Sequence, residues 1–180
     1  MNKADLRKLI KQRSKAFDAD AKTKADQTIL EYLMKLIKDT KSVGIYLSLK
    51  EEVDTFALLK RLLALKIKVS SGVCTKPNIL NFVIIEDLAQ LKKGMLNIYE
   101  PVGEAIAKNM IDVMIVPMVA YDKTKHRLGH GKGYYDRYLS DYQGLKIGLA
   151  YKYQEVENIP WENHDIKMDI IINEEGIISS

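Results

Sequence analysis

The chain has 180 residues, of which 47% are hydrophobic and 29% charged, a composition typical of a globular domain with a full core. No apolar run approaches the ~18 residues of a membrane-spanning helix, and the charged amino terminus lacks the apolar centre of a secretory signal. The single cysteine, Cys74, excludes an intrachain disulfide, and we expect it to be a small buried side chain. These features predict a cytoplasmic protein.

The net charge of +4 is concentrated at the amino terminus. Residues 1–24 contain eight Lys or Arg and three Asp, a net charge of +5, so the rest of the chain carries −1. Such a patch suits RNA, an acidic membrane surface or a polyanionic small molecule, and the alternative is a solvated helix face. Lys3, Arg7 and Lys11 are four residues apart and share one face of the helix expected over 2–16.

Helices and strands alternate along the chain after this first helix. Asp20 is positioned to cap a second helix with an apolar stripe, and Asp54 is positioned to cap a third. A short helix is expected directly after the glycine-rich segment near residue 130. The expected strands cover residues 42–47, 66–73, 80–85, 112–119, 145–151 and 168–173.

This alternation predicts a mostly parallel sheet with crossover helices. The continuous apolar run at 112–119 is typical of a strand covered on both faces. Ligands of such sheets bind beyond the carboxyl ends of the strands. We therefore expect the loops after Leu47, Val119 and Tyr151 to form one rim around a site.

The segment from Arg127 to Arg137, RLGHGKGYYDR, has the features of a phosphate-binding loop. Glycines at 129, 131 and 133 alternate directly before a helix, where backbone N–H groups can converge without interference from Cβ atoms. The free N–H groups at the helix start add to this, and Arg127 and Lys132 contribute two cations. The segment therefore predicts phosphate binding, against the alternative of a flexible turn.

The spacing excludes two common nucleotide-binding motifs. A P-loop has the pattern GxxxxGK[ST], but Lys132 is followed by Gly133 and Tyr134. A dinucleotide fingerprint has the pattern GxGxxG with an acid closing the next strand, and residues 145–152 end without one. Asp136 falls early in the helix, where a carboxylate either complements the helix dipole or binds Mg²⁺ beside a polyphosphate.

Several segments, in order along the chain, resemble the 5-formyltetrahydrofolate cyclo-ligase (methenyltetrahydrofolate synthetase) family. They are Lys3 and Arg7, YLSLKEEVDT at 46–55, DVMIVPMVAYD at 112–122, RLGHGKGYYDRYL at 127–139, and HDIKMDIIINEEGI at 164–177. The resemblance implies one domain over residues 1–180, with a three-layer, Rossmann-like α/β fold whose mostly parallel central sheet is flanked by helices. It also implies an ATP- and Mg²⁺-dependent ligase of one-carbon metabolism that converts 5-formyltetrahydrofolate to 5,10-methenyltetrahydrofolate, with release of ADP and phosphate.

The resemblance assigns roles by position. Arg127 and Lys132 are the expected catalytic residues, and Asp136 and Asp169 are the expected Mg²⁺ ligands. The expected ATP contacts are Lys3, Arg7, Arg127, Leu128, Gly129, His130, Gly131, Lys132, Gly133, Tyr134 and Tyr135, although the helical spacing of Tyr135 also fits core packing. The expected folate contacts are Leu47, Glu52, His130, Gly131, Lys132, Gly133 and Tyr134.

Four positions depart from the usual pattern of the family, namely Met118, His130, Lys132 and Asn173. Met118 and His130 bear on the shape of the folate pocket. Lys132 adds a cation where many members have glycine, which favours phosphate binding.

The chemistry implied by the resemblance needs little from the protein beyond position and charge. The N5-formyl group is amide-like, and we expect its oxygen to attack the γ-phosphoryl group of ATP, after which N10 attacks the resulting imino-phosphate and phosphate departs. Phosphoryl transfer depends on positioning and charge stabilisation, so no protein nucleophile is required. Lys3, Arg7, Arg127 and Lys132 would supply the positive charge.

Glu52 is a candidate for recognising the pterin ring. A carboxylate can accept two N–H bonds from a 2-amino-4-oxo pyrimidine edge, and the alternative is a solvated acid beside Glu51. If the folate carries a polyglutamate tail, the basic residues 1–24 would attract it.

Two other functions remain open from the sequence. An RNA-binding module would use the basic amino terminus and several of the ten tyrosines, but these do not alternate with the basic residues and no RNA-binding motif is present. A phosphate-binding enzyme of similar fold would act on a sugar phosphate or a CoA ester. The expected partners are ATP and the folate, with no nucleic acid, membrane or obligate protein partner.

Overall fold

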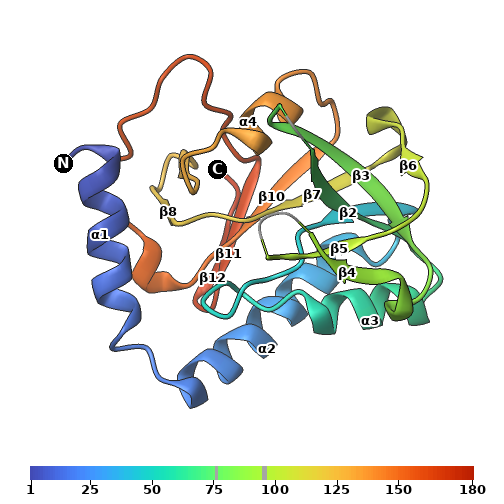
Figure 1. Ribbon diagram of the computed structural model, residues 1–180. Helices are drawn as coiled ribbons and strands as arrows, with labels where there is room; N and C mark the ends of the chain where they lie inside the picture. Colours follow the sequence, from blue (N-terminus) through green and yellow to red (C-terminus); the bar gives the residue numbers. More distant parts are fainter. Residues whose placement is uncertain (76, 95–96) are drawn as a thin grey trace.

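The computed structural model describes residues 1–75, 77–94 and 97–180, and its centre is an eight-stranded sheet (Figure 1). In spatial order the strands are β12 (Gly176–Ile178), β11 (Ile170–Asn173), β10 (Leu145–Leu149), β7 (Val113–Val116), β1 (Ser42–Ile45), β2 (Lys68–Thr75), β3 (Ile79–Ile85) and β6 (Ala105–Ile106). The five strands from β11 to β2 run parallel, whereas β12, β3 and β6 pair antiparallel with their neighbours. The expectation of a mostly parallel sheet is confirmed.

Helices cover both faces of this sheet and give three layers (Figure 1). The helices are α2 (Ala19–Ile37) and α3 (Phe56–Ala64) on one face and α4 (Tyr134–Leu139) on the other. Strand β7 alternates between the two layers. Val113 and Ile115 pack with α2 and α3, and Met114 and Val116 pack with Leu139 of α4. Every residue of β7 is therefore buried, as the apolar run predicts.

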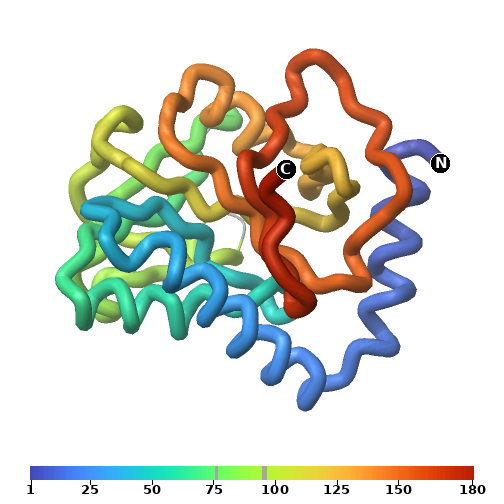
Figure 2. The backbone as a smooth tube through the Cα atoms, turned by 180° about the vertical axis from the view of Figure 1, so that it is seen from behind, coloured from blue at the N-terminus to red at the C-terminus, as the bar shows by residue number. Residues whose placement is uncertain are grey.

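Helix α1 (Lys3–Ser14) lies at the side of the molecule, apart from the other helices, in both views (Figures 1 and 2). Its buried residues Leu6 and Ile10 pack on Leu128 of a hairpin formed by β8 (Ala120–Tyr121) and β9 (Arg127–Leu128). This packing holds the basic amino terminus beside the loop that follows β7.

Smaller elements complete the chain. They are the hairpin of β4 (Leu91–Lys93) with β5 (Tyr99–Pro101), and the single turns η1 (Leu88–Gln90), η2 (Lys108–Met110) and η3 (Lys152–Gln154). None of these was expected from hydrophobic periodicity, because each has only three residues and no repeating apolar face. Among the described residues, no helix is long and apolar enough to cross a membrane.

Capping corrects one expectation from the sequence. Asp18, not Asp20, caps α2, because Asp18 is extended and its side chain accepts the N–H of Ala21 at 2.8 Å, whereas Asp20 already lies in the first turn. At α3 the N-cap residue is Thr55, and the expected Asp54, one residue earlier, accepts the N–H groups of Phe56 and Ala57 at 3.2 Å.

Candidate functional site

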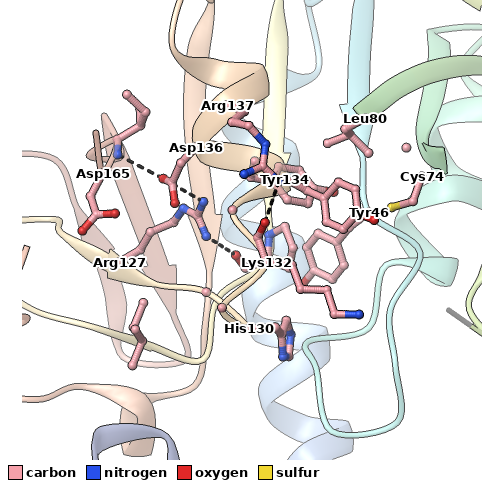
Figure 3. Close-up of a pocket in the computed structure, with 18 of the residues that line it drawn as sticks. Tyr46, Cys74, Leu80, Arg127, His130, Lys132, Tyr134, Asp136, Arg137 and Asp165 are labelled. Carbon is pink, nitrogen blue, oxygen red and sulfur yellow. Dashed lines mark hydrogen bonds and ion pairs between the residues drawn. The ribbon is translucent and has the colours of Figure 1, made fainter. Parts of the chain in front are cut away.

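A cleft of about 1040 Å³ lies beyond the carboxyl ends of β1, β7 and β10 (Figure 3). The loops that follow these three strands all line it, as expected from the parallel order. Helix α1 and the β4–β5 hairpin contribute further walls. Small-molecule sites usually measure roughly 300–1000 Å³, so this cleft has room for two ligands of moderate size.

The glycine segment lies in close contact with Arg7 of helix α1. Gly131 and Gly133 have φ angles of +102° and +69°, which side chains with a Cβ rarely adopt. A Cβ atom at Gly131 would lie 3.3 Å from Nη2 of Arg7. Arg7 also donates from Nε to the carbonyl oxygen of Gly129 at 3.0 Å. The segment therefore brings the Arg7 guanidinium of α1 against its own backbone.

Arg127 is buried at the base of the cleft (Figure 3). Its Nη2 lies 3.2 Å from Oδ1 of Asp136, and its Nη1 donates to the carbonyl oxygen of Pro117 at 3.4 Å. Among the described residues, its Nε finds no hydrogen-bond acceptor although it is buried. Burial lowers the pKa of Arg127, and the nearby Asp136 carboxylate opposes this, so the guanidinium stays charged.

The Asp136 carboxylate joins α4 to the loop after β10. Its Oδ1 also accepts the backbone N–H of Ile166 at 3.1 Å. In the same loop, Asp165 Oδ2 lies 2.6 Å from Lys3 Nζ, and Glu162 Oε1 lies 3.4 Å from it. Burial opposes the charged form of Lys3, but the two carboxylates outweigh it and raise the Lys3 pKa. Burial likewise opposes the charged form of Asp165, yet Lys3 holds the Asp165 pKa below its usual range.

Glu52 and Leu47 lie on the opposite side of the glycine segment, in the loop after β1. Glu52 Oε1 accepts the N–H of Leu49 at 2.7 Å, and Oε2 lies 3.6 Å from Nε2 of His130. Only 12% of the Glu52 side chain is exposed. Glu52 is therefore a cleft residue, and the alternative of a solvated acid is wrong.

The remaining residues of the glycine segment also line the cleft. The carbonyl oxygen of Lys132 accepts from Nη2 of Arg137 at 2.6 Å, which fixes the backbone before α4 (Figure 3). Tyr134 is half-buried at the start of α4. Tyr135 lines the cleft and also packs edge-on against Phe82, which confirms the expectation of core packing.

Asp169 does not join this site. It precedes β11 and therefore lies at the amino end of the parallel strands, opposite the cleft. Its Oδ2 accepts the N–H of Lys146 at 2.8 Å and lies 3.2 Å from Lys146 Nζ. The structure thus separates Asp169 from Asp136, against the expectation of a shared Mg²⁺ site.

Two of the four unusual positions are not among the described residues that line the cleft. Met118 is buried and packs against Gly148 on β10, and Asn173 donates to the Tyr121 hydroxyl oxygen at 2.7 Å. The other two, His130 and Lys132, line the cleft. The departures that bear on ligand shape and charge are therefore confined to the glycine segment.

The structure adds residues that the sequence did not point to. Cys74 lines the cleft and is half-exposed rather than buried, and its N–H donates to Glu100 Oε2 at 2.6 Å. Burial and the Glu100 carboxylate raise the pKa of Cys74, and Lys132 opposes them. Tyr99 lines the same wall. These residues come from β2 and the β4–β5 hairpin, and only the tertiary pairing brings them to the site.

The family described as the 5-formyltetrahydrofolate cyclo-ligase family matches residues 1–174. A 5-formyltetrahydrofolate cyclo-ligase of Haemophilus influenzae is 33% identical over 160 residues, which cover 82% of this chain and 85% of the relative.

Two solved structures are similar over almost the whole chain. The 5,10-methenyltetrahydrofolate synthetase of Aquifex aeolicus is 31% identical with a TM-score of 0.89, covering 99% of this chain and 93% of that one. The 5,10-methenyltetrahydrofolate synthetase of Mycoplasma pneumoniae is 29% identical with a TM-score of 0.80, covering 97% and 99%.

Proposed function

Because the chain belongs to the 5-formyltetrahydrofolate cyclo-ligase family, we propose that its cleft binds ATP and 5-formyltetrahydrofolate together, on either side of the glycine segment. The enzyme catalyses the ATP-dependent cyclisation of 5-formyltetrahydrofolate to 5,10-methenyltetrahydrofolate. The observation that carries the arrangement is the convergence of Arg7, Arg127 and Glu52 on one segment of alternating glycines. We further propose that residues 1–180 act as one domain, located in the cytoplasm.

The ATP phosphates belong on the side of the cleft where cations gather. Lys3, Arg7, Arg127 and Lys132 all line the cleft, together with Gly129, Gly131 and Gly133. Arg127 Nε is buried and has no acceptor among the described residues, which supports a ligand oxygen there because a buried donor without an acceptor is costly. Helix α4 has only six residues, so its dipole contributes less than the four cations.

Asp136 fits a magnesium ion that arrives with the nucleotide. Its Oδ1 is occupied by Arg127 and Ile166, whereas no described residue donates to its Oδ2. Mg²⁺ is usually held by one or two carboxylates together with phosphate oxygens and water. In the described part of the chain, no three His, Cys, Asp or Glu side chains are grouped as a metal site. Mg²⁺ would then neutralise phosphate charge, with Asp136 as its protein ligand.

The folate belongs on the side of Glu52. Glu52 Oε2 lies in the cleft beside His130, while Glu52 Oε1 accepts a hydrogen bond from the loop backbone. A carboxylate in this position can accept N–H groups from the amino-pyrimidine edge of a pterin. Leu47 and Leu80 provide apolar wall for the ring.

The reaction then requires charge stabilisation at the phosphoryl group. The formyl oxygen attacks the γ-phosphorus, the bond to the β-phosphate oxygen breaks, and ADP departs. N10 next attacks the activated formyl carbon, the carbon–oxygen bond breaks, and inorganic phosphate leaves as N10 loses its proton. Arg127 and Lys132 stabilise the negative charge on the transferring group, and removing one such preorganised group costs about 3–4 kcal/mol.

The basic amino terminus fits a polyanionic extension of the folate. Residues 1–24 carry a net charge of +5, and α1 borders the cleft through Lys3 and Arg7. We propose that a polyglutamate tail is attracted to this charge. At low salt, affinity should rise with tail length, and equal affinities for folates with one and with several glutamates would exclude this part of the proposal.

The proposed function is tested by mixing the purified protein with Mg·ATP and 5-formyltetrahydrofolate. We expect the methenyl chromophore to form together with one ADP per folate, and no ADP without folate. An RNA-binding protein or a sugar-phosphate or CoA-ester enzyme would release no folate-dependent ADP, and that result would overturn the assignment.

A further inference from the structure

Tyr151 and Asp26 meet directly behind the loop that carries Glu52. Tyr151 follows β10, is fully buried, and donates from its hydroxyl to Asp26 Oδ1 at 2.5 Å. The same hydroxyl lies 3.2 Å from the carbonyl oxygen of Glu52, so its single proton is shared between two acceptors, of which Asp26 Oδ1 is the nearer. Asp26 Oδ1 also accepts the N–H of Asp54 at 3.2 Å. Tyr151 and Asp26 therefore contact the backbone at both ends of the short segment 52–54, Tyr151 at Glu52 and Asp26 at Asp54.

The pair is itself fixed by its surroundings. The Tyr151 ring packs against the rings of Phe17 and Tyr153, with centroids 4.7 and 5.7 Å away. Asp26 Oδ2 lies 2.9 Å from Lys22 Nζ on the same helix. Burial and the bond to Asp26 raise the pKa of Tyr151, so its hydroxyl keeps its proton. The contact to the loop therefore has a defined geometry.

The Glu52 side chain is coupled to its own backbone. Glu52 Oε1 accepts the N–H of Leu49 at 2.7 Å, and the N–H of Glu52 donates to the Leu49 carbonyl at 3.1 Å. The segment 49–52 is thus a turn closed by two hydrogen bonds. A shift of its backbone at Glu52 would carry Oε2 with it, away from its position in the cleft.

We propose that Tyr151 and Asp26 are positioning residues for folate recognition. Their hydrogen bonds to the backbone of residues 52 and 54 fix the turn and so set the direction of Glu52 Oε2. Neither belongs to the described residues that line the cleft, so they act through Glu52 and not through ligand contact. Recognition by two parallel hydrogen bonds is sensitive to such placement. This inference rests on the proposed folate-binding role of Glu52.

The test compares Tyr151→Phe with Tyr142→Phe. Both changes remove one buried hydroxyl that donates to a neighbouring acceptor, but Tyr142 donates to the Ile111 carbonyl, at 2.8 Å, before the amino end of β7. The ring packing is kept in both variants. We expect Tyr151→Phe to raise the KM for 5-formyltetrahydrofolate about fivefold and to leave the KM for ATP unchanged. Tyr142→Phe should lower the melting temperature comparably without changing either KM.

A double-mutant cycle separates this inference from its premise. Glu52→Gln should raise the folate KM, and adding Tyr151→Phe to it should raise the KM little further, because both changes remove the same interaction. Asp26→Asn, which keeps an acceptor oxygen, should give a smaller rise than Tyr151→Phe and serves if the latter does not fold.

The outcomes are distinguishable. If Glu52→Gln leaves the folate KM unchanged, the proposed role of Glu52 is wrong, and the positioning role falls with it. If Glu52→Gln raises the folate KM while Tyr151→Phe and Asp26→Asn behave like Tyr142→Phe, only the positioning role is overturned. Equal rises in the KM for folate and ATP, or full additivity with Glu52→Gln, would also overturn it.

Discussion

The guanidinium of Arg127 and the carboxylate of Asp136 lie 3.2 Å apart and join β9 to the first turn of α4. The pair spans the glycine segment, whose two ends are therefore held at a fixed separation. One carboxylate oxygen and one guanidinium nitrogen contribute to this bond, while Arg127 Nε has no acceptor among the described residues. Arg127 and Asp136 thus fix the shape of the glycine segment, while Arg127 Nε and Asp136 Oδ2 have no hydrogen-bond partner among the described residues and could bind a ligand.

Arg127→Ala should lower turnover at least about 100-fold, because about 3–4 kcal/mol of transition-state stabilisation is lost. Steady-state kinetics measures this, with circular dichroism to confirm that the variant is folded. Arg61→Ala is the matched control, since Arg61 forms an exposed pair with Glu31 at 2.8 Å. Near-normal turnover in folded Arg127→Ala would remove this residue from the catalytic site.

Asp136→Ala should also lower turnover at least about 100-fold, and should raise the Mg²⁺ concentration needed for half-maximal activity. The reason is the loss of the proposed protein ligand to the metal. Asp169→Ala should leave the Mg²⁺ dependence unchanged, because Asp169 pairs with Lys146 at the opposite edge of the sheet. A magnesium titration of both variants checks this, and the reverse ranking would contradict the site described.

Glu52→Gln should raise the KM for 5-formyltetrahydrofolate far more than the KM for ATP. The amide keeps the shape of the side chain but loses the charge that would bind the pterin N–H groups, a difference of about 1.5–3 kcal/mol. Glu51→Gln is the control, since Glu51 is the exposed neighbour in the same loop. Equal effects of Glu52→Gln on both KM values would count against the assignment.

Lys3→Met should raise the KM for ATP and should lower stability by up to about 1 kcal/mol at neutral pH. The difference in unfolding free energy between wild type and Lys3→Met should depend on whether both Lys3 and Asp165 are charged. The pKa of Asp165 is held below its ordinary 3.8, so this contribution is present above that pH and is lost as the pH falls through the lower, folded value. The Lys3 pKa is raised above 10.5, so the contribution of the ion pair to stability is fully present below pH 10.5. It is lost as the pH rises through the higher pKa of Lys3 in the folded protein.

Denaturant unfolding of wild type and Lys3→Met across the pH range measures this difference. We expect a plateau between these limits and convergence of the two curves in acid. A difference that grows below pH 3.8 would show that the ion pair is not its source.

Local patterns in the sequence predicted the parts of the site that lie within one loop. The glycine segment is identifiable because backbone freedom, charge and a following helix are visible in a few neighbouring residues, whereas the choice of Glu52 over a solvated acid depends on the family resemblance. Helix α1 was also expected, together with the common face of Lys3 and Arg7, because their spacing matches the helical repeat.

Contacts between distant segments were not predictable in this way. The pairing of Lys3 with Asp165 joins residues 162 positions apart, and Tyr151 reaches Asp26 across 125 positions. The expectation that Asp169 binds Mg²⁺ came from the family resemblance by position, whereas its location at the amino end of β11 depends on the sheet order. Side-chain chemistry alone does not say at which edge of a sheet a residue lies.

The central claim is that the glycine segment, with Arg7 and Arg127, binds the phosphates of ATP. Titration calorimetry of Mg·ATP into the wild-type protein and into Arg7→Ala tests it most directly. We expect saturable binding to wild type below millimolar concentration, at least about tenfold weaker binding to Arg7→Ala, and no measurable binding of adenosine to either protein. Absence of heat with wild type at millimolar Mg·ATP, or equal affinity in Arg7→Ala, would contradict the account.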